Sequence, residues 1–461
     1  VIRELSCSAA ELSMYFVVNL AEQVQCFLAS DGTEPYSDGN DSDNEFEQRI
    51  SPDEKFVDCP ESGYIFYNTQ VVFDRDGRVI ASYRKKHLFL EPHFRPGEQP
   101  DEDAIFNTDF GVTFTLQICF DIMYESPGKY NIDHLGIRDV AMSTAWIDEL
   151  PHLTAPQVWK GWSDGNRVNL IVANYHNPAK GELGSGIFRG LTSNPETYLY
   201  DVEAGTSLIV GKVKSRSSVK RENRKIDEET RAKKIQNTQN EGQNRKLENT
   251  LAENLEKNIN NNNIHNNNNN NQKRNLGARA KIGENQAFYH EDLSLYNSSS
   301  LDKTDTEQVL IKTVCSDDGF CCDLTYSYLL NQSEMGLYKL FAYSGLVEKG
   351  DGVYSMYTQT CSVVYCLSDE VNSCARIEGR EPEHSTLRVF EVRGTFASGD
   401  IYPSVFTQYL KLEDSSNWNF TLAQYPEYYH ASMFMHEKTE NLLAITMFSR
   451  WYARDPFQNF K

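Results

Sequence analysis

Two segments of this chain place a lysine and a cysteine where a β-strand is expected to end. In the first, residues 67–83 form two alternating stretches of apolar and polar residues around an Asp-Gly pair and lead to Lys85. In the second, the β-branched and aromatic residues 111–118 lead directly into Cys119. The Asp-Gly pair predicts a β-hairpin, and the second run predicts a strand, a sharp elbow and the start of a helix. We therefore expect both side chains at one edge of a sheet.

This pair of residue types suits the cleavage of an amide. A thiolate beside an ammonium is a nucleophile with a stabiliser for the oxyanion next to it. At an elbow, the backbone N–H of Phe120 faces the same space as the thiol and also donates to the oxyanion. Taken alone, a cysteine at a strand end is more often an inert core residue, and a lysine in a basic run is more often solvated. The order of the surrounding motifs decides between these interpretations.

Seven ordered blocks of the chain resemble the nitrilase (carbon-nitrogen hydrolase) superfamily, and within it the vanin and biotinidase branch. The blocks are Tyr67-Asn68-Thr69, residues 83–89, Glu91-Pro92, residues 119–122, 144–146, 167–174 and 184–187. Three later blocks resemble the C-terminal module of vanins, at residues 315–322, 389–396 and 448–455. The resemblance implies an α/β fold, a nitrilase-type αββα sandwich, followed by a β-rich C-terminal domain.

The resemblance also implies roles for three residues. In that family a cysteine forms an acyl-enzyme, a lysine stabilises the tetrahedral intermediate and a glutamate is the general base. Cys119 and Lys85 match the first two roles, and Glu91 matches a second glutamate that supports the lysine or positions water. The general base should lie before Arg3, where the chain has no matching residue. Since the chain begins with Val1 midway through the pattern, we expect an N-terminal truncation that removes the first strand-helix unit.

The function implied by the resemblance is hydrolysis of a linear secondary amide, such as pantetheine to pantothenate and cysteamine. The expected partner is a small-molecule amide, and no metal or organic cofactor is needed. Two alternatives stay open at this point. One is biotinidase-like hydrolysis of biotinyl amides. The other is a catalytically inactive secreted binding protein, because the general-base glutamate is absent and general-base assistance contributes about 10² to 10⁴ in rate.

Composition divides the chain into three expected parts. Residues 1–211 carry the alternating strand and helix signals of an α/β layer protein. Residues 212–304 combine a basic run with asparagine repeats and offer little to bury, so we expect a disordered insertion. Residues 305–461 contain many short β-branched and aromatic runs, which predict a β-rich domain. The basic run suits polyanions, but the net charge of −21 opposes phosphate binding, and no nucleic-acid partner is expected.

Within the first part, residues 154–166 predict a helix with Pro156 in its first turn. Strands are predicted at 168–175, 198–202 and 207–210. Aromatic faces suit a pantothenyl or biotin group, so Trp146 and Trp162 are candidates to line a pocket, although core positions are commoner for such residues.

Cysteine usage favours an oxidising compartment. Nine of the ten cysteines lie away from the expected nucleophile, and oxidised pairing is favoured for such a number. Cys26 and Cys59 flank an acidic segment at 30–45 and are expected to close its base. The six cysteines after residue 305 are expected to form three bridges, with fifteen connectivities open, and Cys7 would stay free. Zinc is the alternative for these six, but no pair has Cys-x-x-Cys spacing.

The remaining signals favour secretion. Four Asn-x-Ser/Thr sequons begin at Asn40, Asn297, Asn331 and Asn419, which suits a glycoprotein. No run of about 18 apolar residues predicts a membrane span, and Phe460-Lys461 end the chain without the hydrophobic tail of a lipid-anchor signal. We therefore expect a secreted protein.

Overall fold

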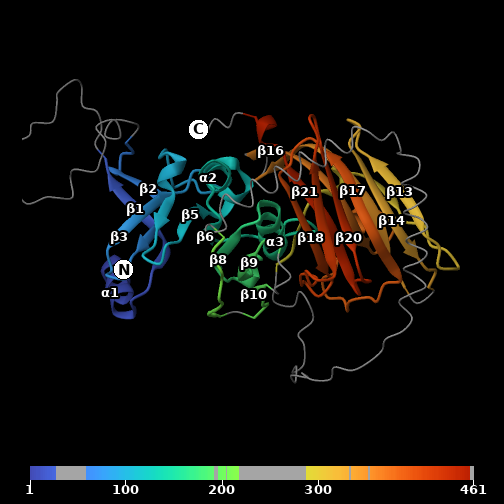
Figure 1. Ribbon diagram of the computed structural model, residues 1–461, viewed down its shortest axis with the longest axis horizontal. Helices are drawn as coiled ribbons and strands as arrows, with labels where there is room; N and C mark the ends of the chain where they lie inside the picture. The colour runs from blue at the N-terminus through green and yellow to red at the C-terminus, as the bar shows by residue number, and fades with distance from the viewer. Residues whose placement is uncertain are drawn as a thin grey trace, which may run out of the picture. The chain divides into compact units, whose positions relative to one another are not determined.

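The structure is a computed structural model (Figure 1) that describes residues 1–26, 59–191, 196–203, 205–216, 287–331, 334–350 and 354–456. All of them lie in one structural unit, formed by Val1–Ser217 and Lys281–Lys461. The acidic segment at 30–45 and most of the expected insertion lie outside the described residues, so the division into three parts stays a prediction. Described strands resume at β11 (Tyr289–His290), ahead of the expected boundary at residue 305.

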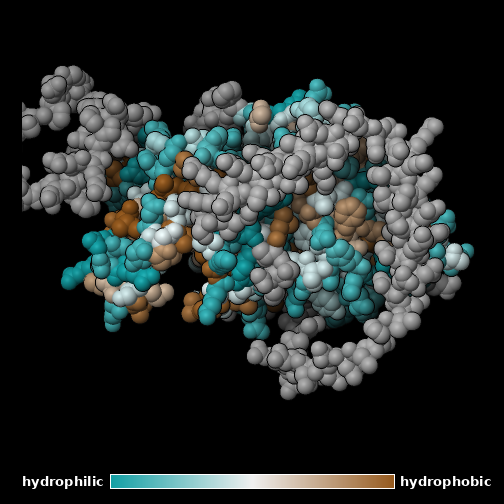
Figure 2. Space-filling model, in the orientation of Figure 1, coloured by the Kyte–Doolittle hydropathy of each residue, from teal (hydrophilic) through white to brown (hydrophobic). Residues whose placement is uncertain are grey.

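The predicted hairpin supplies two of the three strands of a small antiparallel sheet, β2 (Tyr64–Phe73) and β3 (Val79–Arg84). The sheet has the order β1 (Phe16–Gln25), β2 and β3, preceded by α1 (Ile2–Leu12). In the turn, Gly77 has a φ of 79°, and a Cβ there would lie 2.3 Å from the Ser6 carbonyl oxygen of α1. Glycine is therefore required both for the turn and for the close approach of the helix. Figure 2 shows hydrophobic side chains on the visible face over this sheet. Val79 and Ile80 of β3 are among its exposed apolar residues.

A six-stranded mixed sheet forms the second layer. In sheet order its strands are β10 (Thr197–Leu199), β9 (Ser185–Arg189), β8 (Asn169–Asn174), β6 (Asp139–Thr144), β5 (Thr113–Ile118) and β4 (Ile105–Asn107). Strands β5, β6 and β8 are parallel, so their carboxyl ends share one edge, where ligands of open α/β sheets bind. The strand predicted at 207–210 was wrong: no strand forms there, and Leu208 and Val210 are 88% and 78% exposed.

The two sheets pack face to face, with helices on the outside. A cluster that includes Val72 and Tyr83 of the first sheet and Leu116 and Ile118 of the second fills the space between them. Helix α1 contacts β2 of the first sheet, while α2 (Tyr130–Leu135) and α3 (Ala155–Asn166) share an apolar cluster with β6 and β8 of the second. The other helical elements of these layers are η3 (Asp101–Asp103), η4 (Cys119–Met123), η5 (Glu125–Lys129) and η6 (Pro178–Lys180). This arrangement confirms the αββα layering that the resemblance implied.

Helix α3 forms where the sequence predicted a helix, and an aspartate outside the helix caps its first turn. Thr154 is the N-cap residue and Pro156 lies in the first turn, yet the Thr154 side chain makes no capping bond. Instead, the carboxylate of Asp148 accepts a hydrogen bond from the Ala155 N–H at 2.7 Å. On this helix Trp162 is buried, and Trp146 is buried ahead of it with its indole N–H bonded to the Leu153 carbonyl. Both tryptophans are therefore core residues.

The C-terminal region consists of two five-stranded antiparallel sheets (Figure 1). The first has the order β12 (Asn297–Ser300), β15 (Leu337–Lys349), β16 (Tyr354–Cys366), β21 (Leu442–Arg450) and β18 (Ile401–Thr407). The second has the order β13 (Leu310–Cys315), β14 (Cys321–Tyr328), β17 (Leu387–Phe396), β20 (Tyr429–Met435) and β19 (Trp418–Gln424). Three short 3₁₀ turns are η7 (Leu293–Leu295), η8 (Val371–Ser373) and η9 (Tyr452–Arg454). One large apolar cluster lies between the sheets, which confirms the predicted β-rich domain.

The described cysteines are paired as the sequence led us to expect. The four disulfides are Cys26–Cys59, Cys315–Cys321, Cys322–Cys361 and Cys366–Cys374. Cys7 and Cys119 are free thiols. The zinc alternative is therefore wrong, because all six C-terminal cysteines are used in disulfides. This many disulfides indicates an oxidising, non-cytoplasmic compartment.

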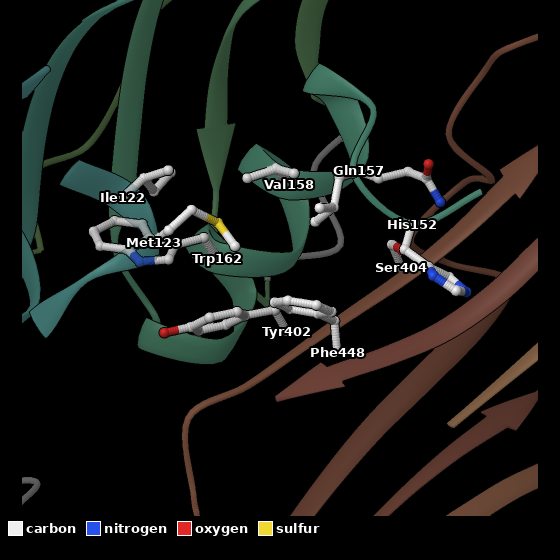
Figure 3. A pocket seen from close by; sticks show the side chains of 10 residues that line it. Ile122, Met123, His152, Gln157, Val158, Trp162, Tyr402, Ser404 and Phe448 are labelled. Atoms are coloured by element: carbon white, nitrogen blue, oxygen red, sulfur yellow. The ribbon is translucent and has the colours of Figure 1, made fainter. Parts of the chain in front are cut away.

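The α/β layers and the C-terminal sheets pack directly against each other. Glycines allow α3 to approach β18 closely, since a Cβ at Gly165 would lie 2.3 Å from the Ile401 carbonyl oxygen. A cavity of about 10 Å³ remains nearby, among Met123, Trp162 and Tyr402 (Figure 3). It has room for about one water molecule, so it is too small to receive an amide substrate. A further small contact is the parallel pairing of β11 with β7 (Glu149–Leu150).

Candidate active site

Cys119 lies at the elbow that the sequence predicted. It follows β5 directly and begins the 3₁₀ helix η4. Its φ is 48°, in the left-handed region that residues with a Cβ rarely adopt and that often marks a functional site. The thiol is free and only partly buried, and it borders the core clusters on both faces of the six-stranded sheet. The arrangement presents a sulfur atom at the carboxyl edge of the parallel strands.

Asp121 fixes the shape of this elbow. Its side chain is fully buried and accepts hydrogen bonds from the Ile118 N–H at 2.9 Å and the Tyr83 hydroxyl at 2.8 Å. It also accepts one from the His87 N–H at 3.0 Å, and the His87 ring nitrogen Nδ1 lies 2.9 Å away. One carboxylate therefore joins the Cys119 elbow to the segment that carries Lys85. Burial and the negative charge of Asp121 raise the pKa of Tyr83 well above its usual value.

Lys85 is buried beside the elbow. Its side chain is 2% exposed, and Nζ lies 2.5 Å from Oε2 of Glu91. Its backbone is held on both sides, since its N–H donates to the Asn68 carbonyl and its carbonyl accepts from the Gly97 N–H, both at 2.8 Å. Burial disfavours the ammonium, but the negative charges of a Cys119 thiolate and of Glu91 outweigh this effect and raise the pKa of Lys85. The ammonium form is therefore favoured at this position.

Glu91 is held by three donors. Oε2 accepts hydrogen bonds from the Lys85 ammonium and, at 3.0 Å, from the Phe89 N–H. Oε1 accepts one from the side-chain amide of Asn68 at 2.5 Å. The Asn68 side chain is itself fixed, because its Oδ1 accepts from the Asn19 amide at 2.7 Å. Both oxygens of the carboxylate thus have defined partners. The charge pair is the kind that persists in a buried site only when such hydrogen bonds support it.

The structure brings the three predicted residues into one group. Lys85 is in direct contact with Glu91 and in electrostatic contact with Cys119. Two supporting residues, Asp121 and Asn68, had no predicted role. Both lie in motifs that the sequence presented, Cys119-Phe120-Asp121 and Tyr67-Asn68-Thr69, but only the fold shows what their side chains hold. Chemically, the group offers a thiol nucleophile, a fixed cation and a carboxylate that orients the cation.

No group of three or more His, Cys, Asp or Glu side chains is arranged to hold a metal ion in the part of the chain that the structure describes. Within the same residues, no helix is both long enough and apolar enough to cross a membrane.

Two family models match this chain. "Carbon-nitrogen hydrolase" matches residues 49–127, a range that contains Lys85, Glu91 and Cys119. "Vanin C-terminal domain" matches residues 286–455, which include both C-terminal sheets. The two models therefore cover the candidate site and the β-rich region separately.

Several curated proteins are similar along the chain. Vanin-like protein 1 of Drosophila melanogaster is 29% identical over 414 residues, which are 87% of this chain and 60% of that protein. Vanin-like protein 3 of the same organism is 40% identical over 189 residues, 41% of this chain and 31% of that protein. A pantetheinase of Bos taurus is 26% identical over 461 residues, 99% of this chain and 72% of that protein. The chain thus spans less than two thirds of the length of the first two relatives.

Among solved structures, an amidase from Nesterenkonia sp. overlaps 44% of this chain and 59% of its own. The sequence identity is 17% and the TM-score is 0.27. This overlap is too weak to bear on the site.

Proposed function

We propose that the chain, which matches family models of carbon-nitrogen hydrolases and of the vanin C-terminal domain, hydrolyses a linear secondary amide of the pantetheine type through an acyl-enzyme on Cys119. The products from pantetheine would be pantothenate and cysteamine. The observation that carries the proposal is the buried Lys85–Glu91 pair beside a free thiol at a strained elbow. The pantetheinase names of relatives that match nearly the whole chain support the same substrate class.

The proposed first half-reaction is acylation. The Cys119 thiolate forms a bond to the carbonyl carbon of the amide, and the carbonyl oxygen becomes an oxyanion. The Lys85 ammonium and the Phe120 N–H donate to that oxyanion, which lowers the barrier because both donors are fixed before the reaction begins. The carbon–nitrogen bond then breaks, and the amine leaves with the proton that the Cys119 thiol gave up when it formed the thiolate.

The second half-reaction is hydrolysis of the thioester. Water attacks the acyl carbon, the carbon–sulfur bond breaks, and the acid leaves as the thiol is restored. Glu91 acts through Lys85 in both halves: it holds the ammonium at 2.5 Å and takes its own position from Asn68 and the Phe89 N–H. Glu91 is therefore proposed as a positioning carboxylate.

We further propose that the protein acts outside the cell. The four disulfides support this, since such bonds persist in secreted proteins and are rare in reducing compartments. The sequons at Asn297 and Asn419 stand on exposed residues of the C-terminal sheets, so glycosylation is a compatible prediction.

Intact-mass spectrometry of the full-length protein tests the function. The protein is incubated briefly with pantetheine or with biocytin, quenched in acid and digested to locate any adduct. We expect a pantothenyl adduct on the Cys119 peptide, together with free cysteamine in solution. A biotinyl adduct at Cys119 instead would keep the mechanism and replace the substrate. A folded protein with neither adduct nor free amine would contradict the enzymatic proposal and favour the binding alternative.

A further inference from the structure

Tyr354 of the C-terminal region reaches the loop that carries Glu91. It is the first residue of β16, it is 7% exposed, and its hydroxyl accepts a hydrogen bond from the Leu90 N–H at 2.9 Å. Leu90 directly precedes Glu91 and has a φ of 52°, in the left-handed region. A leucine holds this conformation only where its surroundings fix it. The Tyr354 hydroxyl supplies one such constraint from the other region of the molecule.

Leu90 lies directly between Phe89, whose N–H orients the Glu91 carboxylate, and Glu91. On its N-terminal side, the Phe89 N–H donates to Oε2 of Glu91 at 3.0 Å. On its C-terminal side is Glu91, and Oε2 of Glu91 also binds the Lys85 ammonium. A change of the Leu90 backbone would therefore shift the carboxylate relative to the ammonium that it holds.

The Tyr354 ring also contacts the elbow. It stacks on Phe89 with centroids 5.4 Å apart and meets Phe120 edge-on at 5.3 Å. Phe89 and Phe120 are themselves 4.7 Å apart, so the three rings form one cluster. Phe120 directly follows Cys119 and carries the N–H that we assign to the oxyanion. Tyr354 thus touches both segments of the candidate site.

A second contact from the C-terminal region holds the far end of the elbow helix. Arg450 of β21 is fully buried, and its Nε donates to the carbonyl of Met123, the last residue of η4, at 2.8 Å. The guanidinium is fixed in turn by Asp455 at 2.5 Å. Both segments that carry candidate catalytic groups therefore take part of their support from the C-terminal sheets.

From these contacts we infer that Tyr354 is a positioning residue for the amidase site, and that the C-terminal β-sandwich is part of the active-site scaffold. The inference rests on the proposed function. It assigns to Tyr354 the task of holding Leu90, and through it Glu91 and Lys85, in the geometry that stabilises the oxyanion.

The test compares Tyr354→Phe with a matched control, Tyr402→Phe, in the full-length protein. The first variant keeps the ring cluster and removes only the acceptor for the Leu90 N–H. The control removes a hydroxyl that bonds Tyr452 at 2.7 Å in the same contact between the two regions. Three quantities are measured: kcat and KM for pantetheine, hydrogen exchange of the Leu90 amide, and the pH dependence of Cys119 alkylation by iodoacetamide.

For Tyr354→Phe we expect kcat to fall about 10- to 100-fold with little change in KM, the loss that misplacement of a catalytic group produces. We also expect faster exchange at Leu90 and an alkylation profile shifted to higher pH, since a displaced Lys85 stabilises the thiolate less. Tyr402→Phe should match the wild type in all three measurements.

Two results would overturn the inference. One is unchanged exchange at Leu90 in Tyr354→Phe, and the other is an equal loss of kcat in the control, which would indicate a general effect on the fold. The proposed function fails separately, if the wild type releases no amine. In that case the exchange and alkylation measurements, which need no substrate, still decide whether Tyr354 fixes the loop.

Discussion

The α/β layers and the C-terminal sheets use buried polar chemistry in different ways. The C-terminal region places its six cysteines in three disulfides, while the six-stranded sheet of the α/β layers presents Cys119 as a free thiol at its edge. Near that thiol, the layers bury the charges of Lys85 and Asp121 instead. The C-terminal cysteines are therefore used for covalent links, whereas around Cys119 buried charges arrange a thiol that stays reactive.

The arrangement of the strands brings C-terminal cysteines together in two ways. Cys315 and Cys321 are direct partners in the β13–β14 ladder, and Cys322 of β14 is bonded to Cys361 of β16 across the two sheets. Cys119 instead follows its strand at a turn and has no cysteine partner among the described residues. Cysteine is therefore a structural residue in the C-terminal region, whereas Cys119 of the α/β layers is available for chemistry.

The largest expected effect comes from removing the free thiol. Cys119→Ala should lower kcat for amide hydrolysis by at least about 10⁴-fold, because no other group forms the acyl intermediate. The thermal unfolding curve should stay close to that of the wild type, since the thiol is only partly buried. Cys7→Ala, at the other free and exposed thiol, is the control and should keep full activity. Turnover retained in Cys119→Ala would remove the proposed nucleophile.

Removing the buried cation should have the next largest effect. Lys85→Met keeps the length of the side chain and loses the oxyanion donor, so we expect kcat to fall about 10² to 10³-fold. Lys86→Met is the matched control, because the adjacent lysine pairs with Asp101 rather than with Glu91. Steady-state kinetics and urea unfolding should be measured on the same samples. Equal kcat values for the two variants would mean that Lys85 is a structural residue only.

Among the disulfides, the longest described loop of the C-terminal region should matter most for stability. Cys322–Cys361 spans 39 residues and Cys315–Cys321 spans 6. Because loop-closure entropy grows with length, replacing the first pair by alanines should lower the free energy of unfolding by about 4 kcal/mol and the second by about 2 kcal/mol. Urea unfolding of the two double variants measures this order. The reverse order would show that the unfolded chain is not the main source of the effect.

Local sequence patterns predicted much of the fold but did not predict the contacts between distant segments. The Asp-Gly hairpin, the Cys119 elbow and helix α3 all follow from short-range sequence signals. Tyr354 and Arg450 were not predicted, because they contact Leu90 and Met123 across separations of 264 and 327 residues. Spacing along a chain carries no information on such pairs until the layers are assembled.

The false strand and the supporting residues illustrate the same limit. Residues 207–210 contain the short apolar run Leu-Ile-Val that suits a strand, but none of the described strands pairs with them, and Leu208 and Val210 stay exposed. Asp121 and Asn68 stood in motifs that the sequence displayed, yet their roles depend on donors from other elements. Sequence thus identified the reactive groups better than the residues that orient them.

The last expected effect, which is confined to part of the pH range, concerns a buried charge of the α/β layers away from the thiol. Burial raises the pKa of Asp148 to about 7, although hydrogen bonds from Tyr200 and the Ala155 N–H act in the opposite direction. The unfolded chain releases this proton near pH 4, so the folded state binds it more tightly. The resulting stabilisation is complete below about pH 4 and is lost as the pH rises to about 7.

Asp148→Asn should therefore abolish this part of the pH dependence. Between pH 5 and pH 7 the free energy of unfolding of the wild type should fall relative to the variant by at most about 1.4 kcal/mol per pH unit. Tyr200→Phe removes a hydrogen bond that lowers the pKa, so it should extend the loss to higher pH. Urea unfolding at pH 5, 6, 7 and 8 measures both shifts. If the free energy of unfolding depends on pH in the same way for the wild type and for Asp148→Asn, Asp148 stays ionised across this range. Its two hydrogen bonds would then suffice to stabilise the buried carboxylate.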